Sequence, residues 1–136
     1  MPASFLLHPQ LEADTSPFRE LELSAVRIMN NGLLPWLILV PRVADARDII
    51  DLTEEQQQQL TREIAAASRA LRTAFRPDKL NVAALGNMVP QLHVHIIARF
   101  SNDPAWPKPV WGNLPPAPYS EGQLGEFCDC LRAHWQ

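Results

Sequence analysis

The first half of the chain alternates between apolar and polar positions in a way typical of β-strands. Between Phe18 and Met29 every second residue is apolar over several positions, which predicts a strand with one buried face. The Asn-Asn-Gly at residues 30–32 has the composition of a turn. A continuous apolar run then covers residues 36–40 and stops at Pro41. We expect this run to be a strand buried on both faces that forms a hairpin with the strand before it.

In the middle of the chain, apolar residues recur every three or four positions, which indicates a long helix. Thr53 and Gln56 have capping-box spacing, in which the Thr hydroxyl accepts one free backbone amide and the Gln side chain accepts another. The apolar stripe that follows consists of Leu60, Ile64, Ala67, Leu71 and Phe75. Because Pro77 disfavours a helical conformation of the preceding residue, the helix is expected to end near Arg76.

The second half returns to strand patterns and closes with another helix. Residues 80–85 are strand-like, Gly86-Asn87 is a turn candidate, and residues 92–100 form a second apolar run. Together they predict another antiparallel hairpin. Ser120 and Gln123 repeat the capping-box spacing. The apolar positions of the short amphipathic helix that follows are Leu124, Phe127, Leu131 and Trp135.

One segment has a biased composition. Between Pro104 and Pro118 the chain contains six prolines, together with Trp106 and Trp111. Proline removes backbone amide donors and fixes φ, so residues 101–119 are expected to form an extended, partly rigid loop. The sequence leaves open whether this loop packs on the surface, covers a site or reaches a partner subunit.

The order of the elements predicts the fold class. Strands, a helix, strands and a helix give an α+β domain with an antiparallel sheet of about five strands, a long helix, and a C-terminal helix over residues 120–136. We expect the helices on one side of the sheet. At 136 residues the chain fits one domain, residues 1–136, that can bury a core without disulfides or metal ions.

Charge and cysteine content restrict the possible partners. Fifteen acidic and twelve basic residues leave a formal charge of −3 without a Lys/Arg block, so bulk binding of nucleic acid is not expected and any phosphate must be bound locally. No secretory signal and no apolar window of membrane-spanning length is present, which makes a cytoplasmic location the expectation. Cys128 and Cys130 diverge on a helix and are expected to be free thiols. No cofactor is expected.

Three polar residues interrupt the apolar stretch of residues 88–100. Successive strand side chains point to opposite faces, so Gln91, His93 and His95 are expected in a row on one face. Burying each such group without a partner costs about 1–3 kcal/mol. The row therefore predicts a polar network or an open cleft, and we treat it as the candidate site.

A metal site is one interpretation of the two histidines. Both could reach one ion, but a stable tetrahedral site needs a third and usually a fourth protein ligand. Residues 81–100 contain no carboxylate and no cysteine. We therefore expect no metal here.

Nucleophilic catalysis at phosphorus is the other interpretation. A neutral imidazole offers a lone pair on one nitrogen when an acceptor holds the proton of the other. Attack on phosphorus gives a phosphoramidate intermediate that water can resolve. Asn87, Gln91, His95 and the turn at Gly86 are suitable donors for the phosphate oxygens.

The same stretch resembles a family signature. Residues 86–97, Gly-Asn-Met-Val-Pro-Gln-Leu-His-Val-His-Ile-Ile, are similar to the His-φ-His-φ-His-φ-φ signature of the histidine triad (HIT) superfamily, which follows Gly-Gln-Ser/Thr-Val. Residues 36–42 resemble its first conserved core strand, which ends in Pro-Lys or Pro-Arg. Asn81 stands where the family carries a nucleotide-contacting Asn. Order and spacing match over about Leu21 to Phe100.

The resemblance implies an α+β homodimer that binds a nucleotide on its sheet and transfers or hydrolyses a nucleotidyl group. By position, His93 is the nucleophile, His95 holds the α-phosphate, and Gln91 takes the place of the first histidine. The implied substrate-binding positions are Asn81, Gly86, Asn87 and, as weaker ribose candidates, Asn30 and Asn31. The implied substrates are dinucleoside polyphosphates or nucleoside phosphoramidates.

Three departures from the family pattern leave two functional classes open. Gln91 cannot relay a proton near neutral pH, Met88 removes a hydroxyl, and Pro35-Trp36 replaces a smaller segment at the start of the core strand. The main-chain carbonyl of Gln91 can still orient His93. The chain is then either a HIT-type enzyme acting on a nucleotide, or a nucleotide-binding sensor or interaction module with little turnover.

Overall fold

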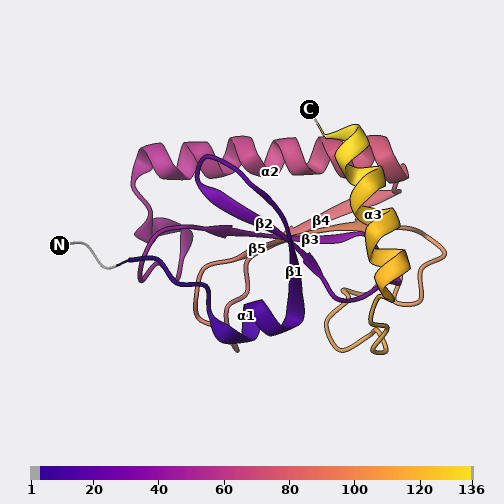
Figure 1. Cartoon of the computed structure of the whole chain (residues 1–136). Coiled ribbons are helices and arrows are strands. Elements are labelled where there is room, and N and C mark those ends of the chain that lie inside the picture. Colours follow the sequence, from indigo (N-terminus) through magenta and orange to yellow (C-terminus); the bar gives the residue numbers. More distant parts are fainter. Residues whose placement is uncertain (1–3, 136) are drawn as a thin grey trace.

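A five-stranded antiparallel sheet forms the centre of the computed structural model, which describes residues 4–135. The strand order is β1-β2-β3-β5-β4 (Figure 1). The strands are β1 (Thr15–Glu20), β2 (Ser24–Met29), β3 (Trp36–Pro41), β4 (Lys79–Ala83) and β5 (Val94–Arg99). The helices are α1 (Pro9–Asp14), α2 (Glu54–Phe75) and α3 (Glu121–His134), with a single 3-10 turn at Ile49–Asp51. The predicted α+β class is confirmed; residues 1–3 and 136 of the predicted domain lie outside the described residues.

Both predicted hairpins are present. β2 and β3 pair with Ile28 opposite Leu37, and β4 pairs with β5 with Ala83 opposite His95. β3 also pairs with β5, which joins the two hairpins into one sheet. All six residues of β3 are buried, as its continuous apolar pattern predicts.

The strand predicted over residues 18–29 is instead two strands, β1 and β2, joined by a tight turn. The backbone amides of Leu23 and Ser24 donate to the carboxylate of Glu63 in α2, at 2.8 and 3.0 Å. The prediction was wrong because this contact comes from a distant helix, which local alternation does not reveal. The turn also changes which side chains of this segment are buried. In β2 the buried side chains are those of Ser24, Val26 and Ile28.

The two predicted helices begin with the caps that the sequence indicates. The amide of Gln56 donates to the Thr53 hydroxyl at 3.1 Å, and the amide of Thr53 donates to the Gln56 side chain at 2.9 Å. Ser120 and Gln123 make the same pair of bonds at 3.2 Å each. α2 ends at Phe75 and is followed by the capping residue Arg76, which takes the left-handed conformation with a φ of 51°.

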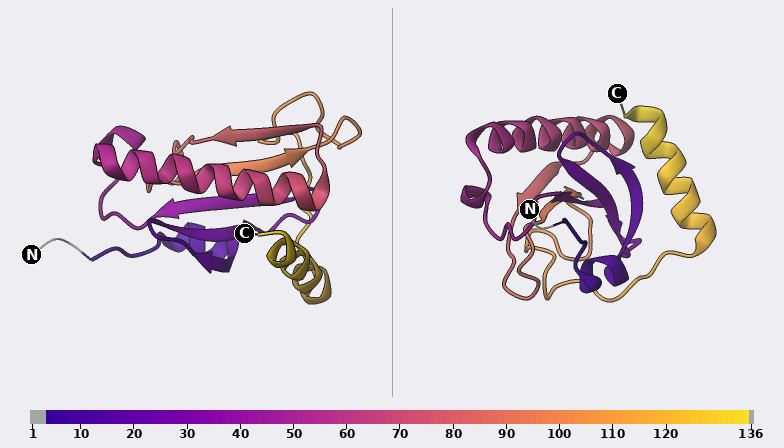
Figure 2. Two further views of the ribbon diagram at one scale, coloured as in Figure 1. Left: turned by 90° about the horizontal axis from the view of Figure 1, so that it is seen from above. Right: turned by 60° about the vertical axis from the view of Figure 1, so that its left-hand side comes forward.

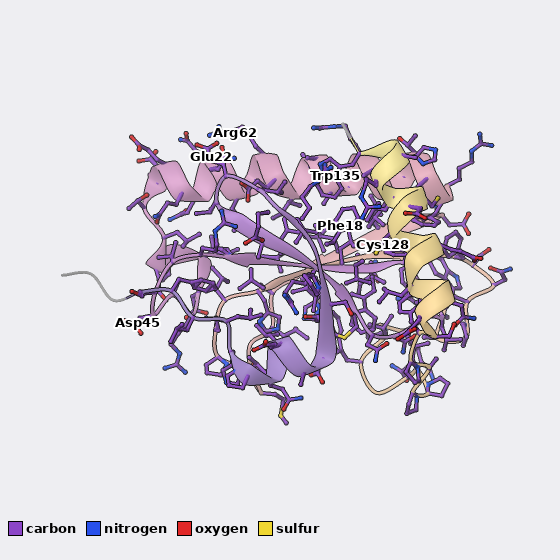
Figure 3. All side chains as sticks on the ribbon, in the orientation of Figure 1. Phe18, Glu22, Asp45, Arg62, Cys128 and Trp135 are labelled. Carbon is purple, nitrogen blue, oxygen red and sulfur yellow. The ribbon has the colours of Figure 1, made fainter. Side chains whose placement is uncertain are left out.

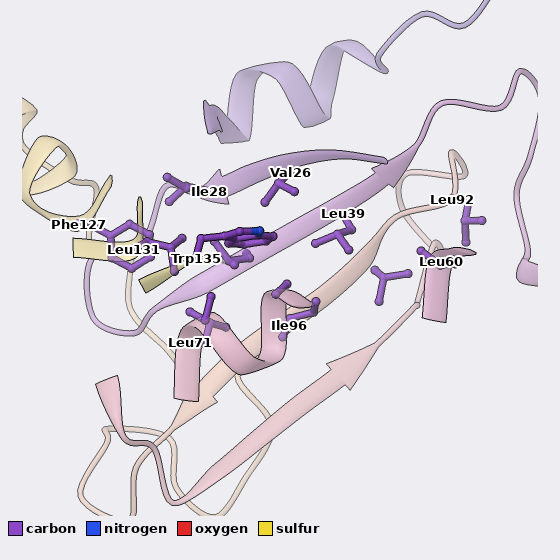
Figure 4. Packing of buried hydrophobic residues seen from close by; sticks show 14 of the residues in the cluster. Val26, Ile28, Leu39, Leu60, Leu71, Leu92, Ile96, Phe127, Leu131 and Trp135 are labelled. Atoms are coloured by element: carbon purple, nitrogen blue, oxygen red, sulfur yellow. The ribbon is translucent and has the colours of Figure 1, made fainter. Parts of the chain in front are cut away.

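One face of the sheet packs against α2 and α3 (Figure 2). Phe18 of β1 and Trp135 after α3 lie with their ring centroids 5.9 Å apart (Figure 3), which fixes the end of the chain against the sheet. Figure 4 shows the core at this face. Its most deeply buried members include Val26, Ile28, Leu39, Leu60, Leu71, Ile96 and Leu131.

The opposite face is covered by α1 and by residues 101–119, which contain no helix or strand. The sequence did not predict α1, and its position means that only α2 and α3 meet the expectation of helices on one side (Figure 1). The second apolar cluster lies here and contains Leu11, Leu34, Trp36, Ile38, Val40, Ile97 and Val110. Within residues 4–135, no helix has the length and apolar character needed to cross a membrane.

Candidate functional site

His93 and His95 lie at the start of β5, on the face that α1 and the Pro-rich loop cover. His95 is held between Ile38 of β3 and Ala83 of β4 by strand pairing. His93 immediately precedes the strand, and the two ring centroids are 5.0 Å apart. Only 7% of His93 and 4% of His95 is exposed. The predicted pair is therefore buried, and its reactivity depends on cavities that reach it.

The ring of His93 is oriented by the main chain. Its Nδ1 lies 2.7 Å from the carbonyl oxygen of Gln91. A carbonyl only accepts hydrogen bonds, so Nδ1 carries the proton. In the neutral ring the lone pair is then on Nε2. The orienting role expected of the Gln91 carbonyl thus matches this geometry.

His95 is fixed in the opposite tautomer. The indole Nε1 of Trp36 donates to Nδ1 of His95 at 3.0 Å, and an indole nitrogen can only donate. Nδ1 of His95 is therefore the unprotonated nitrogen, and Nε2–H is left as a donor. Burial, with a smaller contribution from the nearby His93, lowers the pKa of His95 to about 4. At neutral pH, His95 is thus an uncharged hydrogen-bond donor.

The side chain of Gln91 turns away from both histidines and binds the N-terminal segment. Its Oε1 accepts the backbone amide of His8 at 2.8 Å, and its Nε2 donates to the carbonyl of Leu6 at 2.8 Å. The amide thus pairs with one stretch of backbone as a neighbouring strand would. The expected row of three polar side chains is reduced to His93 and His95.

Two cavities meet at His93. One, of about 330 Å³, is lined by both histidines together with Asp14, Asn87 and Trp111; we call it the Trp111 cavity. The other, of about 350 Å³, is lined by His93, Leu92 and the loop that contains Arg47; we call it the Arg47 cavity. Leu85 and Gly86 line both. Gly86 has a φ of 75°, a conformation that favours glycine, so the turn between the cavities depends on this residue.

A comparison of the sequence with models of protein families identifies the family of this chain. The model of the HIT domain matches residues 10–102, more than half of the chain. The chain belongs to the histidine triad family. The predicted family resemblance is confirmed.

Solved structures of the family are similar over nearly the whole chain. A histidine triad protein from Bradyrhizobium japonicum is 48% identical with a TM-score of 0.95, covering 98% of this chain and 100% of its own. One from Marinobacter aquaeolei VT8 is 50% identical with a TM-score of 0.94, covering 98% and 97%. A third, from Sinorhizobium meliloti 1021, is 42% identical with a TM-score of 0.93, covering 96% of each chain. The comparison with curated proteins found no match.

The Pro-rich loop brings an aromatic side chain to this HIT site. The ring of Trp111 meets His95 edge-on at 5.0 Å and Trp36 at 6.1 Å between centroids. The loop is anchored by buried Arg99, whose guanidinium donates to both carboxylate oxygens of Asp103 at 2.8 and 3.1 Å. Those hydrogen bonds are the main cause that lowers the pKa of Asp103 to about 2. The ion pair therefore holds the segment that carries Trp111.

Three of the five expected substrate-binding positions lie away from the two cavities. Asn81 uses its Oδ1 to accept from Arg99 at 2.9 Å. Asn30 accepts the backbone amide of Tyr119 at 2.9 Å, and Asn31 accepts that of Leu33 at 3.0 Å. These three side chains therefore stabilise the fold. The two positions that do line the cavities are Gly86 and Asn87.

Sequence reasoning did not assign a role to four residues beside the histidines, Trp36, Trp111, Asp14 and Arg47. The indole of Trp36 is the only side-chain donor on the otherwise aliphatic strand β3, which could have suggested a buried partner. Asp14 and Arg47 are charged residues in segments without a motif, so the sequence gives no comparable signal. Within residues 4–135, no group of three or more His, Cys, Asp or Glu residues could hold a metal ion.

Proposed function

We propose that this HIT protein is a nucleotidyl hydrolase or transferase that acts at the α-phosphate of a nucleotide. Membership of the family supports nucleotide binding. The observation that carries the proposal is the tautomer of His93. Its Nδ1 proton is held by the Gln91 carbonyl, so the lone pair of Nε2 is the nucleophile at the junction of two cavities.

The reaction has two displacement steps. In the first, Nε2 of His93 forms a bond to the α-phosphorus while the bond from phosphorus to the leaving group breaks. Both nitrogens of His93 are then substituted, and the ring is a cation whose Nδ1–H still donates to the Gln91 carbonyl. In the second step, water forms the new P–O bond and gives up a proton to solvent, the P–N bond breaks, and its electron pair returns to Nε2 of the neutral imidazole that leaves. Transfer to another acceptor follows the same course.

Neighbouring donors stabilise the charge on the phosphate oxygens. His95 offers Nε2–H, because Trp36 occupies its other nitrogen. Asn87 lines the Trp111 cavity and supplies an amide donor, and the turn at Gly86 brings backbone near both cavities. Fixed donors around a developing oxyanion lower the barrier without reorganisation.

The Trp111 cavity is the proposed nucleoside site. Trp111 offers an aromatic face for a base, since base–aromatic stacking contributes about 1–3 kcal/mol and tolerates any base. Asp14 lines the same cavity, and its carboxylate can accept hydrogen bonds from ribose hydroxyls. These residues take the part that the sequence resemblance assigned to Asn30 and Asn31.

We further propose that the protein is a homodimer. β4 is one of the two edge strands of the sheet, and among residues 4–135 it pairs only with β5. It carries exposed Val82, and exposed Leu85 follows it. An apolar strand edge of this kind can pair with another strand. A second β4 is the partner that symmetry provides.

The second functional class remains a nucleotide-binding sensor with little turnover. The observation that favours it is the side chain of Gln91, which stands in the first position of the triad and is bound to backbone groups of Leu6 and His8. It therefore offers no group that can protonate a leaving group. Binding without turnover would identify this class.

Binding and turnover of the His93→Ala variant separate the two classes. For an enzyme, we expect calorimetry to show adenosine monophosphate binding within a few-fold of wild type. Hydrolysis of a dinucleoside polyphosphate should fall by about 10³-fold or more, because the nucleophile is missing. His134→Ala, at the exposed end of α3, is the matched control and should retain both. Nucleotide binding by wild type without any hydrolysis would contradict the enzyme proposal.

A further inference from the structure

The cavity at His93 that Trp111 does not line indicates what kind of leaving group the site can accept. The group displaced from phosphorus departs opposite the attacking nitrogen, so it needs a space separate from the nucleoside. The Arg47 cavity, of about 350 Å³, supplies that space beside His93. Its lining therefore determines which leaving groups are compatible with the reaction.

No side chain of this cavity is suited to protonate a leaving atom. Apart from His93, the charged or titratable residues that line it are Arg47 and Asp48. A guanidinium stays protonated throughout the working pH range, and an exposed carboxylate acts as an acceptor. Gln91 lines a neighbouring cavity that shares Arg47 with this one, and there its amide donates to Leu6 and accepts from His8. A leaving group must therefore depart as a stable anion.

Arg47 supplies a positive charge at the same place. Its backbone amide donates to the Asp51 carboxylate at 3.0 Å, which fixes the loop beside His93. Its guanidinium makes no hydrogen bond or ion pair with any residue from 4 to 135. An exposed guanidinium with five free donors has the geometry to bind phosphate oxygens in pairs.

We propose, on the basis of the function inferred above, that the enzyme acts on phosphoanhydrides and that Arg47 binds the departing phosphate. The substrate class is thus nucleotides with a further phosphate on the α-phosphate, in preference to nucleoside phosphoramidates. The nucleoside part lies in the Trp111 cavity and the second phosphate in the Arg47 cavity.

The atoms balance without an acid for an anhydride. Nε2 of His93 bonds to the α-phosphorus, the bridging P–O bond breaks, and its electron pair stays on the oxygen of the departing phosphate. Phosphate monoesters have a second pKa of about 6, so that anion is stable at neutral pH. In a phosphoramidate of an alkylamine, the P–N bond breaks only if the nitrogen gains a proton. The Arg47 cavity lacks a group to provide it.

Three substrates with one nucleoside test this inference. The first is a dinucleoside polyphosphate, the second a 4-nitrophenyl ester of the nucleoside monophosphate, and the third a phosphoramidate of an alkylamine. The ester departs as a stabilised phenolate, so it needs neither an acid nor a phosphate-binding residue. For wild type we expect adduct formation with the first two. Turnover of the phosphoramidate should be about 10²-fold slower or more, the usual contribution of general acid catalysis.

Arg47→Met removes the charge and keeps most of the side-chain length. We expect the ratio of kcat/KM for the polyphosphate to that for the ester to fall by about tenfold, as for loss of a charged hydrogen bond. The matched control is Arg62→Met, on the exposed side of α2 (Figure 3), which should leave this ratio at the wild-type value.

The outcomes distinguish this inference from the function on which it depends. Equal rates with polyphosphate and phosphoramidate, or an Arg47→Met ratio equal to that of wild type, would overturn the leaving-group assignment and leave the nucleotidyl transfer mechanism intact. Absence of a His93 adduct with all three substrates would overturn both.

Discussion

Two buried histidines side by side have different chemical roles because each has a different partner on Nδ1. A carbonyl oxygen holds the proton of His93, and the indole of Trp36 donates to His95. One ring therefore presents a lone pair and the other a proton donor. The sequence predicted the pair and the orienting carbonyl, since both follow from spacing along one segment. It could not predict the indole bond, which joins residues 59 positions apart.

Burial of His95 makes stability depend on pH. Its pKa lies at about 4 in the folded protein and near 6.5 in an unfolded chain, so unfolding takes up a proton between these values. The stabilisation is complete above pH 6.5 and is lost as the pH falls towards 4. We expect the free energy of unfolding of wild type to fall by about 3 kcal/mol more than that of His95→Gln between pH 7 and 4.

Chemical denaturation of both proteins at pH 7, 5.5 and 4 measures this difference. His95→Gln is the reference for wild type because it retains all the other titrating groups. A parallel decline of the two proteins would show that His95 titrates at its ordinary value and is not held neutral by burial.

At the scale of elements, local signals predicted α2, α3 and β3 well. Capping boxes and apolar steps are short-range features, so the helix starts at Thr53 and Ser120 could be read directly. The turn between β1 and β2 was missed because buried Glu63 of α2 stabilises it. Elements fixed by tertiary contacts were therefore the ones that local patterns missed.

The N-terminal segment depends on one amide. Gln91 both accepts from and donates to its backbone, so Gln91→Ala leaves the amide of His8 without its partner. We expect hydrogen exchange at this amide to become about fivefold faster, corresponding to the loss of a bond of about 1 kcal/mol. Gln10→Ala removes a nearby amide that bonds only Asp14, and should leave exchange at His8 unchanged. Equal protection of His8 in Gln91→Ala and wild type would contradict the anchoring role.

The sheet of the molecule is covered on both faces and ends in two edge strands, β1 and β4. The core against α2 and α3 follows from apolar periodicity. The second cluster, under α1 and the Pro-rich loop, does not, because irregular segments have no period to read. The two site tryptophans, Trp36 and Trp111, both belong to this less predictable side.

The exposed apolar residue Val82 on the β4 edge gives the prediction for the assembly. We expect sedimentation equilibrium at micromolar concentration to give twice the chain mass. Val82→Lys places a charge on the exposed edge strand β4, which opposes strand pairing, and should give a monomer. Leu33→Lys changes a similarly exposed apolar residue in the β2–β3 connection and should leave a dimer. A wild-type monomer at this concentration would rule out the proposed assembly.

The proposed reaction depends on His93 forming a bond to phosphorus. The most direct measurement is rapid quenching of the protein with a dinucleoside polyphosphate, followed by intact-mass and fragment-mass spectrometry. We predict one nucleoside monophosphate added to the chain, located on His93 and missing in His93→Ala. An adduct on any other residue, or turnover that proceeds with no adduct at the earliest quench times, would contradict the account.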